Sequence, residues 1–156
     1  MQTFSVKLNT VLLAIAAVLC AGAAAAAPSR TWMTEEAMRA AFIGKTLSGH
    51  YVDGLAWTES YGEDGRLDYS EALRRGRGSW HFRGPRIFCT FYDPGHGLAG
   101  GCWNALQVSR NCYEFFPADW LGPETGSETA PSDPLRPWVA RAWRQSEPST
   151  CDEPTA

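Results

Sequence analysis

Short runs of apolar and aromatic residues, separated by glycine-containing turns, dominate the chain from Thr46 onward. Between Leu55 and Tyr61 the bulky residues take every second position, and the turn sequence Gly-Glu-Asp-Gly at 62–65 leads into residues 66–69. Alternation with period two on both sides of a glycine turn is typical of a β-hairpin. The same reasoning predicts further strands at 78–83, 87–92, 102–108 and 112–116, and therefore a meander of short antiparallel strands.

A single short helix is predicted ahead of these strands. Thr34 precedes Glu35 and Glu36, whose charges suit the N-terminus of a helix. The alanine-rich run that follows continues through Phe42 and stops near Gly44.

The last apolar segment, residues 138–144, is open to two interpretations. It fits a helix with Pro137 in its first turn, or a closing strand with Val139, Arg141 and Trp143 on one side. The strand is favoured. With six to eight short strands, one helix and no alternation of strands with helices, the fold class is expected to be mainly β, as a small antiparallel meander or barrel.

The beginning of the chain resembles a secretory signal. Lys7 precedes an uncharged run over residues 11–27 that ends in small residues. Cleavage is expected after Ala26, so residues 1–26 form a signal peptide and the protein is exported, to the periplasm or beyond. Lipid attachment at Cys20 is disfavoured because leucine, not a small residue, precedes it. No membrane span is expected after cleavage.

Residues 27–156 are expected to form one β-rich domain, since about 130 residues suffice for a single core. Its core is assigned to residues 44–116. Residues 117–137 are rich in Pro, Gly, Ser, Thr and acidic residues, which predicts a long surface loop. A closing segment, 138–151, completes the domain.

Four cysteines remain in the mature chain: Cys89, Cys102, Cys112 and Cys151. In an oxidising compartment an even number predicts two disulfides, although four cysteines allow three pairings. Cys89 and Cys102 flank a turn-rich segment and could face each other across a hairpin, which leaves Cys112 for Cys151. We favour this pairing. A zinc site is disfavoured because no C-x-x-C pair is present.

Charge and motifs exclude several functions. Removing the leader takes away Lys7 and leaves 13 basic residues against 17 acidic ones, so nothing favours nucleic-acid binding. No nucleophile elbow, Walker loop, zinc-protease or helix-loop-helix calcium motif is present. His50, His81 and His96 lie in three different segments, so neither a metal site nor a cofactor is expected.

The chain resembles a family of small exported proteins from α-proteobacteria, especially rhizobia-like ones, that have lipocalin-like or related β-meander domains and no established activity. The resemblance covers residues 44–116. Its motifs are Gly44-Lys45-Thr46, Trp57-Thr58-Glu59-Ser60-Tyr61, Ile87-Phe88-Cys89, Cys102-Trp103 and Cys112-Tyr113-Glu114-Phe115. It implies a lipocalin-like fold and export, and no particular activity.

Two acidic residues fall on strand faces that are expected to be buried. Glu59 shares a face with Trp57 and Tyr61, and Glu114 repeats the pattern in the strand at 112–116. Two inward carboxyls in an aromatic barrel could contact a ligand or form an acid–base pair. The candidate ligand contacts are therefore Trp57, Glu59, Tyr61, Trp80, Phe82, Trp103 and Glu114.

The basic cluster of the chain allows a structural interpretation of these two acids, and this interpretation is favoured over ligand contact. Arg77, Arg83 or Arg86 could pair with a buried glutamate, and such a pair would have no role in binding. Arg74, Arg75 and Arg77 are otherwise expected in a solvated loop, with docking of an anionic partner as the alternative.

Three functional hypotheses follow. The favoured one is an exported, non-enzymatic binding module for a small apolar or amphipathic ligand. The second is a cell-envelope interaction or inhibitor protein without a pocket. The third is a small hydrolase that uses Glu59 and Glu114 as its two carboxyls.

Overall fold

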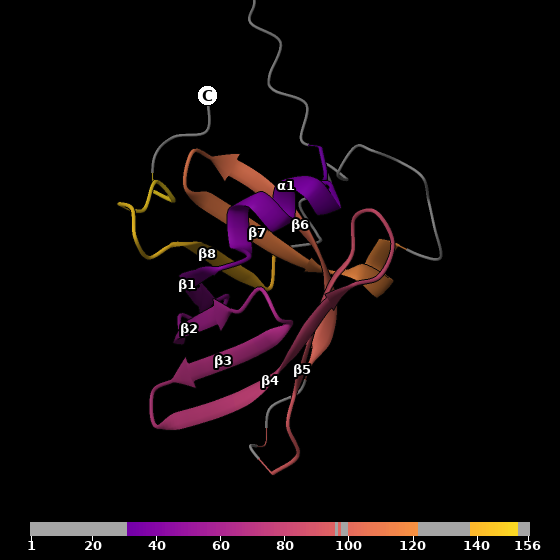
Figure 1. Cartoon of the computed structure of the whole chain (residues 1–156). Helices are drawn as coiled ribbons and strands as arrows, with labels where there is room; N and C mark the ends of the chain where they lie inside the picture. The colour runs from indigo at the N-terminus through magenta and orange to yellow at the C-terminus, as the bar shows by residue number, and fades with distance from the viewer. Residues whose placement is uncertain (1–30, 96, 98–99, 122–137, 153–156) are drawn as a thin grey trace, which may run out of the picture.

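A closed barrel of eight antiparallel strands forms most of the described part of the protein (Figure 1). The computed structural model describes residues 31–95, 97, 100–121 and 138–152, without the side chains of residues 120 and 121. The strands are β1 Lys45–Tyr51, β2 Ala56–Tyr61, β3 Arg66–Glu71, β4 Arg74–Phe82, β5 Phe88–Tyr92, β6 Gly101–Ser109, β7 Cys112–Pro117 and β8 Ala140–Arg144. Helix α1 (Glu35–Phe42) precedes them, and the 3-10 helix η1 (Ala118–Leu121) follows β7.

Each strand pairs with the strands before and after it in sequence, and β8 pairs with β1 to close the sheet. This is the up-and-down barrel architecture of lipocalins. The mainly-β fold with one short N-terminal helix is confirmed. The strand predicted for the closing segment is also confirmed, because Ala140–Arg144 pairs with both β1 and β7.

The strand register decides which side chains enter the barrel. On β2, Trp57, Glu59 and Tyr61 are buried, while Thr58 and Ser60 are half-buried on the other face. Successive residues of a strand point to opposite faces, so the buried set is the inward one. The alternation predicted for this strand is therefore confirmed.

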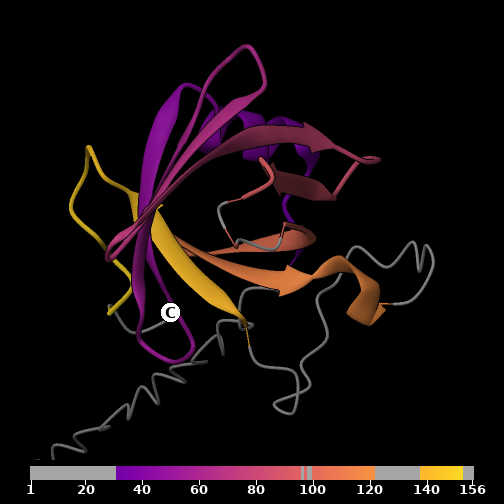
Figure 2. The same ribbon diagram turned by 90° about the horizontal axis from the view of Figure 1, so that it is seen from below.

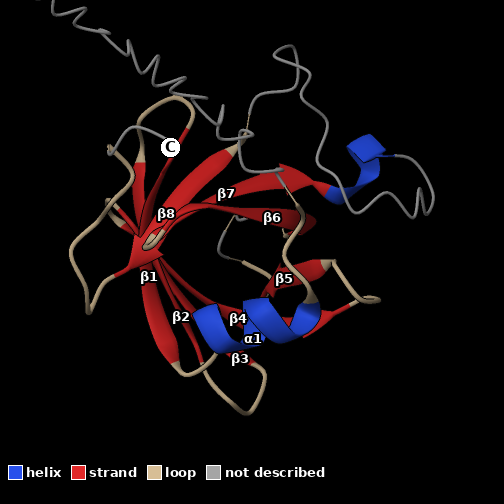
Figure 3. Ribbon diagram, turned by 90° about the horizontal axis from the view of Figure 1, so that it is seen from above, coloured by secondary structure: helices blue, strands red, loops and turns tan. Residues whose placement is uncertain are grey.

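Helix α1 closes one end of the barrel (Figure 3). Its N-cap is Thr34, whose hydroxyl accepts a hydrogen bond from the backbone N–H of Ala37 at 3.2 Å. Phe42 is fully buried, with its ring centroid 5.1 Å from that of Tyr113 and 5.6 Å from that of Phe115. The view from the opposite side shows the ring of strands with α1 behind it (Figure 2).

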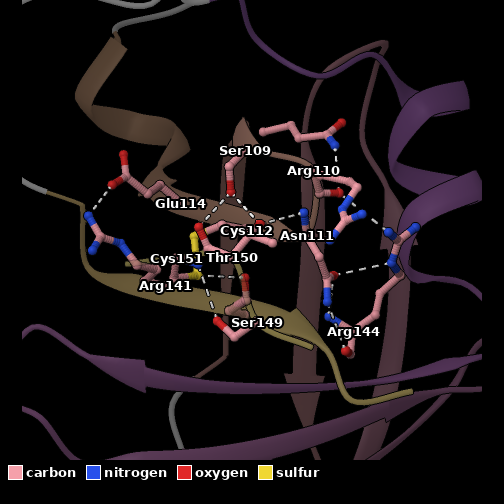
Figure 4. The surroundings of a disulfide bond; sticks show 12 residues. Ser109, Arg110, Asn111, Cys112, Glu114, Arg141, Arg144, Ser149, Thr150 and Cys151 are labelled. Carbon is pink, nitrogen blue, oxygen red and sulfur yellow. Dashed lines mark hydrogen bonds and ion pairs between the residues drawn. A yellow bond between two sulfur atoms is a disulfide. The ribbon is translucent and has the colours of Figure 1, made fainter. Parts of the chain in front are cut away.

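Both predicted disulfides are present. Cys89 and Cys102 join β5 to β6, with their Cα atoms 4.0 Å apart. Cys112 and Cys151 tie the C-terminal tail to the start of β7 (Figure 4). The pairing of near neighbours across one hairpin, with the remaining two cysteines joined over 39 residues, matches the favoured prediction.

The tail makes further contacts beside this second disulfide. Asn111 is fully buried, and its side-chain amide forms hydrogen bonds with the backbone of Arg144, the last residue of β8, and of Glu147 in the segment that follows. Ser109 donates to the carbonyl oxygen of Thr150 at 2.9 Å (Figure 4). The tail is therefore held at the α1 end of the barrel by a covalent bond and a polar network.

The loop predicted for the basic cluster was wrong, although Arg74, Arg75 and Arg77 are exposed to solvent as expected. Arg74, Arg75 and Arg77 lie in β4, not in a loop. Arg77 pairs with Asp68 on the neighbouring strand at 3.7 Å. Residues 74–77 of β4 are three arginines and a glycine, so this half of the strand shows no apolar periodicity, whereas the half from residue 78 onward was predicted as a strand.

Several predicted features lie outside the described residues. These are the signal peptide at 1–26, residues 122–137 of the predicted loop, and His96. Residue 117 ends β7 and residues 118–121 form η1, so the first part of the predicted loop has regular structure. Among the described residues, no group of three or more His, Cys, Asp or Glu side chains could hold a metal ion.

Candidate functional site

A cavity of about 280 Å³ lies inside the barrel. It is lined by Tyr51, Trp57, Glu59, Tyr61, Phe88, Thr90, Tyr92, Trp103, Phe115, Pro117, Val139 and Ala140. Seven of these residues are aromatic, and a ligand site typically combines such walls with a few convergent polar groups. At roughly 30 Å³ per water molecule, this volume is about that of nine waters.

The cavity occupies the half of the barrel that lies away from α1. Its inner wall includes Tyr61 and Phe88, which are buried at the strand ends nearer the helix. Tyr51, Tyr92 and Pro117 are partly exposed at the opposite ends of β1, β5 and β7. The cavity therefore leads from the core towards the end of the barrel that α1 does not cover.

Small residues on the neighbouring strands β1 and β8 make room for the cavity. Ala140 of β8 contributes only a methyl group to the wall, which also includes large aromatic side chains of β2 and β5. Gly49 of β1 faces Trp57, and a Cβ atom at Gly49 would lie 2.5 Å from Cζ2 of that ring. Gly49 thus allows the Trp57 ring to lie against the backbone of β1.

Glu59 is the acidic side chain of the cavity. It is only 6% exposed, and its two carboxyl oxygens accept hydrogen bonds from the hydroxyls of Tyr61 and Tyr92. Burial raises the pKa of Glu59 above its ordinary value, and the two hydrogen bonds oppose that rise only in part. Burial also raises the pKa of Tyr61, so this hydroxyl keeps its proton and remains a donor.

The arginine partners predicted for Glu59 are therefore wrong. Two tyrosine hydroxyls take their place, and Arg77 lies on the outer face with Asp68. Among the described residues, no Lys, Arg or His forms an ion pair with Glu59. The carboxyl is hydrogen-bonded, but its charge has no protein counterion within this part of the chain.

A second polar network lies beside the first. The hydroxyls of Tyr51 and Tyr69 are 3.1 Å apart, and the Tyr69 hydroxyl donates to the carboxylate of Glu71. Glu71 is buried, with a guanidinium nitrogen of Arg74 at 4.0 Å. Burial raises the pKa of Tyr69, and the hydrogen bond to Glu71 adds to the rise. This network places a second acid near the same end of the barrel.

Four of the predicted contact residues line the cavity: Trp57, Glu59, Tyr61 and Trp103. Trp80 and Phe82 do not. Their rings pack with Phe88 at centroid distances of 5.9 and 5.2 Å, and the Arg39 guanidinium lies 4.6 Å from the centroid of Phe82. These two residues fill the α1 end of the core.

The inward placement of Glu114 was wrong. The register pairs Glu114 with Leu106 and Arg141, whereas the neighbouring Phe115 points into the cavity. Glu114 therefore lies on the outer face of β7, where a guanidinium nitrogen of Arg141 is 2.5 Å from its carboxylate (Figure 4). Glu59 and Glu114 are on opposite faces of the barrel wall, so they cannot act together on one substrate.

Glu114 was expected on the inner face because a second apolar cluster, outside the barrel, buries the outer face of β7 as well. Trp32, Leu106 and Phe116 are buried together, with the Trp32 and Phe116 ring centroids 5.3 Å apart. The segment before α1 thus covers the outer face of β6 and β7. Because β7 is buried on both faces, its apolar pattern could not show which face is the inner one.

The sequence analysis missed several cavity residues: Tyr51, Phe88, Thr90, Tyr92, Phe115, Pro117, Val139 and Ala140. Thr90 accepts a hydrogen bond from the indole nitrogen of Trp103 at 3.3 Å. The available signal for Phe88, Thr90 and Tyr92 was their shared parity within the strand predicted at 87–92. The apolar character of both faces of that strand concealed it.

No protein-family model, curated protein or solved structure matches this chain at a significant level.

Proposed function

We propose that this protein is an exported binding protein that holds a small ligand inside its barrel. The observation that carries the proposal is the cavity of about 280 Å³, in which aromatic walls surround the carboxyl of Glu59 and the hydroxyl of Thr90. Such an apolar enclosure with a few convergent polar groups is the usual form of a small-molecule site. The volume suits a ligand of roughly ten non-hydrogen atoms.

Export is supported by two features. The disulfides Cys89–Cys102 and Cys112–Cys151 suit an oxidising compartment. The charged, apolar and small-residue order of residues 1–26 fits a cleavable signal. The proposed location is the periplasm or the exterior, in keeping with the resemblance to small exported α-proteobacterial proteins. Among the described residues, no helix is long and apolar enough to cross a membrane.

The binding role is preferred over hydrolysis. The proposed hydrolase required Glu114 beside Glu59, and Glu114 is instead paired with Arg141 on the outer face. Glu59 itself is held by two tyrosine hydroxyls inside an aromatic cavity, which suits recognition of a ligand group.

A protein-interaction role is the second candidate. Leu73 is fully exposed in the turn between β3 and β4, and Val52 is 64% exposed in the turn between β1 and β2. Both turns lie at the end of the barrel away from α1. Exposed apolar side chains at such turns could contact a partner in the envelope. This candidate is preferred if the cavity binds no small molecule.

The cavity is tested by titration with 2-phenylethanol, a neutral probe of suitable size, followed through the indole N–H signals of Trp57 and Trp103. We expect saturable shifts, and at least tenfold weaker binding by Ala140→Phe, because the new ring would fill the space beside Ala140. Ala56→Phe is the matched control, since Ala56 is exposed at the start of β2. Thermal unfolding of both variants checks that the barrel is intact. Binding that Ala140→Phe leaves unchanged, or no binding at all, would contradict the proposal.

A further inference from the structure

One acidic side chain supplies the charge in the wall of the cavity. Among the residues that line it, Glu59 is the only one of the Asp, Glu, Lys, Arg and His types. The other buried acids of the described chain have basic neighbours: Arg141 is 2.5 Å from Glu114, and Arg74 is 4.0 Å from Glu71. Glu59 has tyrosine hydroxyls in their place.

An acid in this position is costly to keep. Moving a carboxylate out of water without a counterion disfavours folding, and glutamine would have nearly the same shape at lower cost. Buried groups of this kind cluster at functional sites. The two hydroxyl donors hold the carboxyl in one orientation, and each carboxyl oxygen still has a lone pair free for a further donor.

Aromatic rings surround the carboxyl of Glu59 in the cavity. Tyr51, Trp57, Tyr92 and Trp103 line the cavity together with Glu59. The faces of tyrosine and tryptophan rings carry negative potential and attract ammonium groups, most strongly where water is excluded. A carboxylate surrounded by such rings favours a positive charge and disfavours a negative one.

We propose that the ligand of this cavity is a small organic cation, with a protonated amine or quaternary ammonium group beside Glu59 and an apolar body against the aromatic walls. This proposal rests on the proposed binding function and adds the chemical class of the ligand. The ammonium group supplies the counterion that the described part of the chain does not, and the apolar part extends towards Pro117 and Val139 at the outer end of the cavity.

Three probes of matched size separate charge from shape: 2-phenylethylammonium, 2-phenylethanol and phenylacetate. Calorimetric titration of the wild-type protein at neutral pH is expected to show the cation binding at least tenfold more tightly than the alcohol, and phenylacetate binding most weakly. Glu59→Gln should remove the preference for the cation while binding of the alcohol remains. Glu63→Gln, at an exposed position in the turn after β2, makes the same change of charge and should keep the preference.

A pH series provides a second readout that needs no substitution. The groups that face Glu59 are Tyr61, Tyr92 and Tyr51, with the Tyr69–Glu71 pair behind Tyr51. The tyrosines have raised pKa values and stay neutral at acidic and neutral pH, so Glu59 dominates the titration. Below the pKa of Glu59 in the empty protein, a cation must displace a proton. Cation affinity should therefore fall with falling pH, by up to about tenfold per unit, while alcohol affinity stays level.

The outcomes distinguish the two proposals. Equal binding of the cation and the alcohol, or a preference that survives Glu59→Gln and shows no pH dependence, would overturn the cationic ligand and leave the binding function standing. Failure of all three probes to bind would overturn both proposals. Tighter binding of phenylacetate than of the cation would also refute the cationic ligand.

Discussion

Phe42→Ala is expected to lower the free energy of unfolding by about 3–5 kcal/mol, a large part of the stability of a small domain. Phe42 has no exposed surface, and its ring contacts those of Phe88 in β5 and of Tyr113 and Phe115 in β7. Truncation would leave a cavity where α1 closes the barrel, and the rigid sheet could not collapse to fill it. Denaturant unfolding at neutral pH measures the loss.

Leu73→Ala is the control for this substitution. Leu73 is fully exposed in the turn between β3 and β4, so its truncation should change stability by no more than about 0.5 kcal/mol. A loss below about 1 kcal/mol for Phe42→Ala would show that α1 does not form part of the cooperative core.

Asn111→Ala is expected to lower the free energy of unfolding by about 2–4 kcal/mol. The Asn111 side chain is fully buried; its Nδ2 lies 3.1 Å from the carbonyl oxygen of Arg144 and 3.2 Å from that of Glu147. Its Oδ1 accepts from the backbone N–H of Arg144 at 2.9 Å. Alanine would remove these bonds and leave buried backbone groups unpaired, each at a cost of about 1–3 kcal/mol.

Unfolding by denaturant and hydrogen exchange of the Arg144 amide test this expectation together. The amide should exchange faster in the variant, because its acceptor is gone. Gln107→Ala is the matched control, since the exposed Gln107 side chain makes a hydrogen bond to Arg110 at the surface. A loss no larger than that of the control, with an unchanged amide, would refute the role of Asn111 in holding the tail.

Local patterns predicted the elements of this fold well where one face of a strand is polar. The alternation around Glu59 located β2 and its inner face, and the acidic residues after Thr34 located α1. Both signals depend on residues close in sequence. The disulfide pairing could also be predicted from the sequence, because Cys89 and Cys102 flank a single turn.

The features that could not be predicted from the sequence depend on contacts between segments that are far apart in the chain. Glu114 was placed on the wrong face because Trp32, far away in sequence, covers the outside of β7. The first half of β4, residues 74–77, consists of three arginines and a glycine, which gave no apolar signal for a strand. The cavity is formed when β8 closes on β1 and brings small residues such as Ala140 into one wall with large aromatic residues of other strands. No local pattern contains that information.

Native mass spectrometry of the mature protein, purified from the periplasm of an expressing host, tests the central claim most directly. The account predicts a bound small molecule that is lost on denaturation, in a protein whose four cysteines resist thiol labelling. A protein of bare mass under both conditions would contradict the assignment of the cavity as a ligand site, and labelled thiols would contradict the exported, oxidised state.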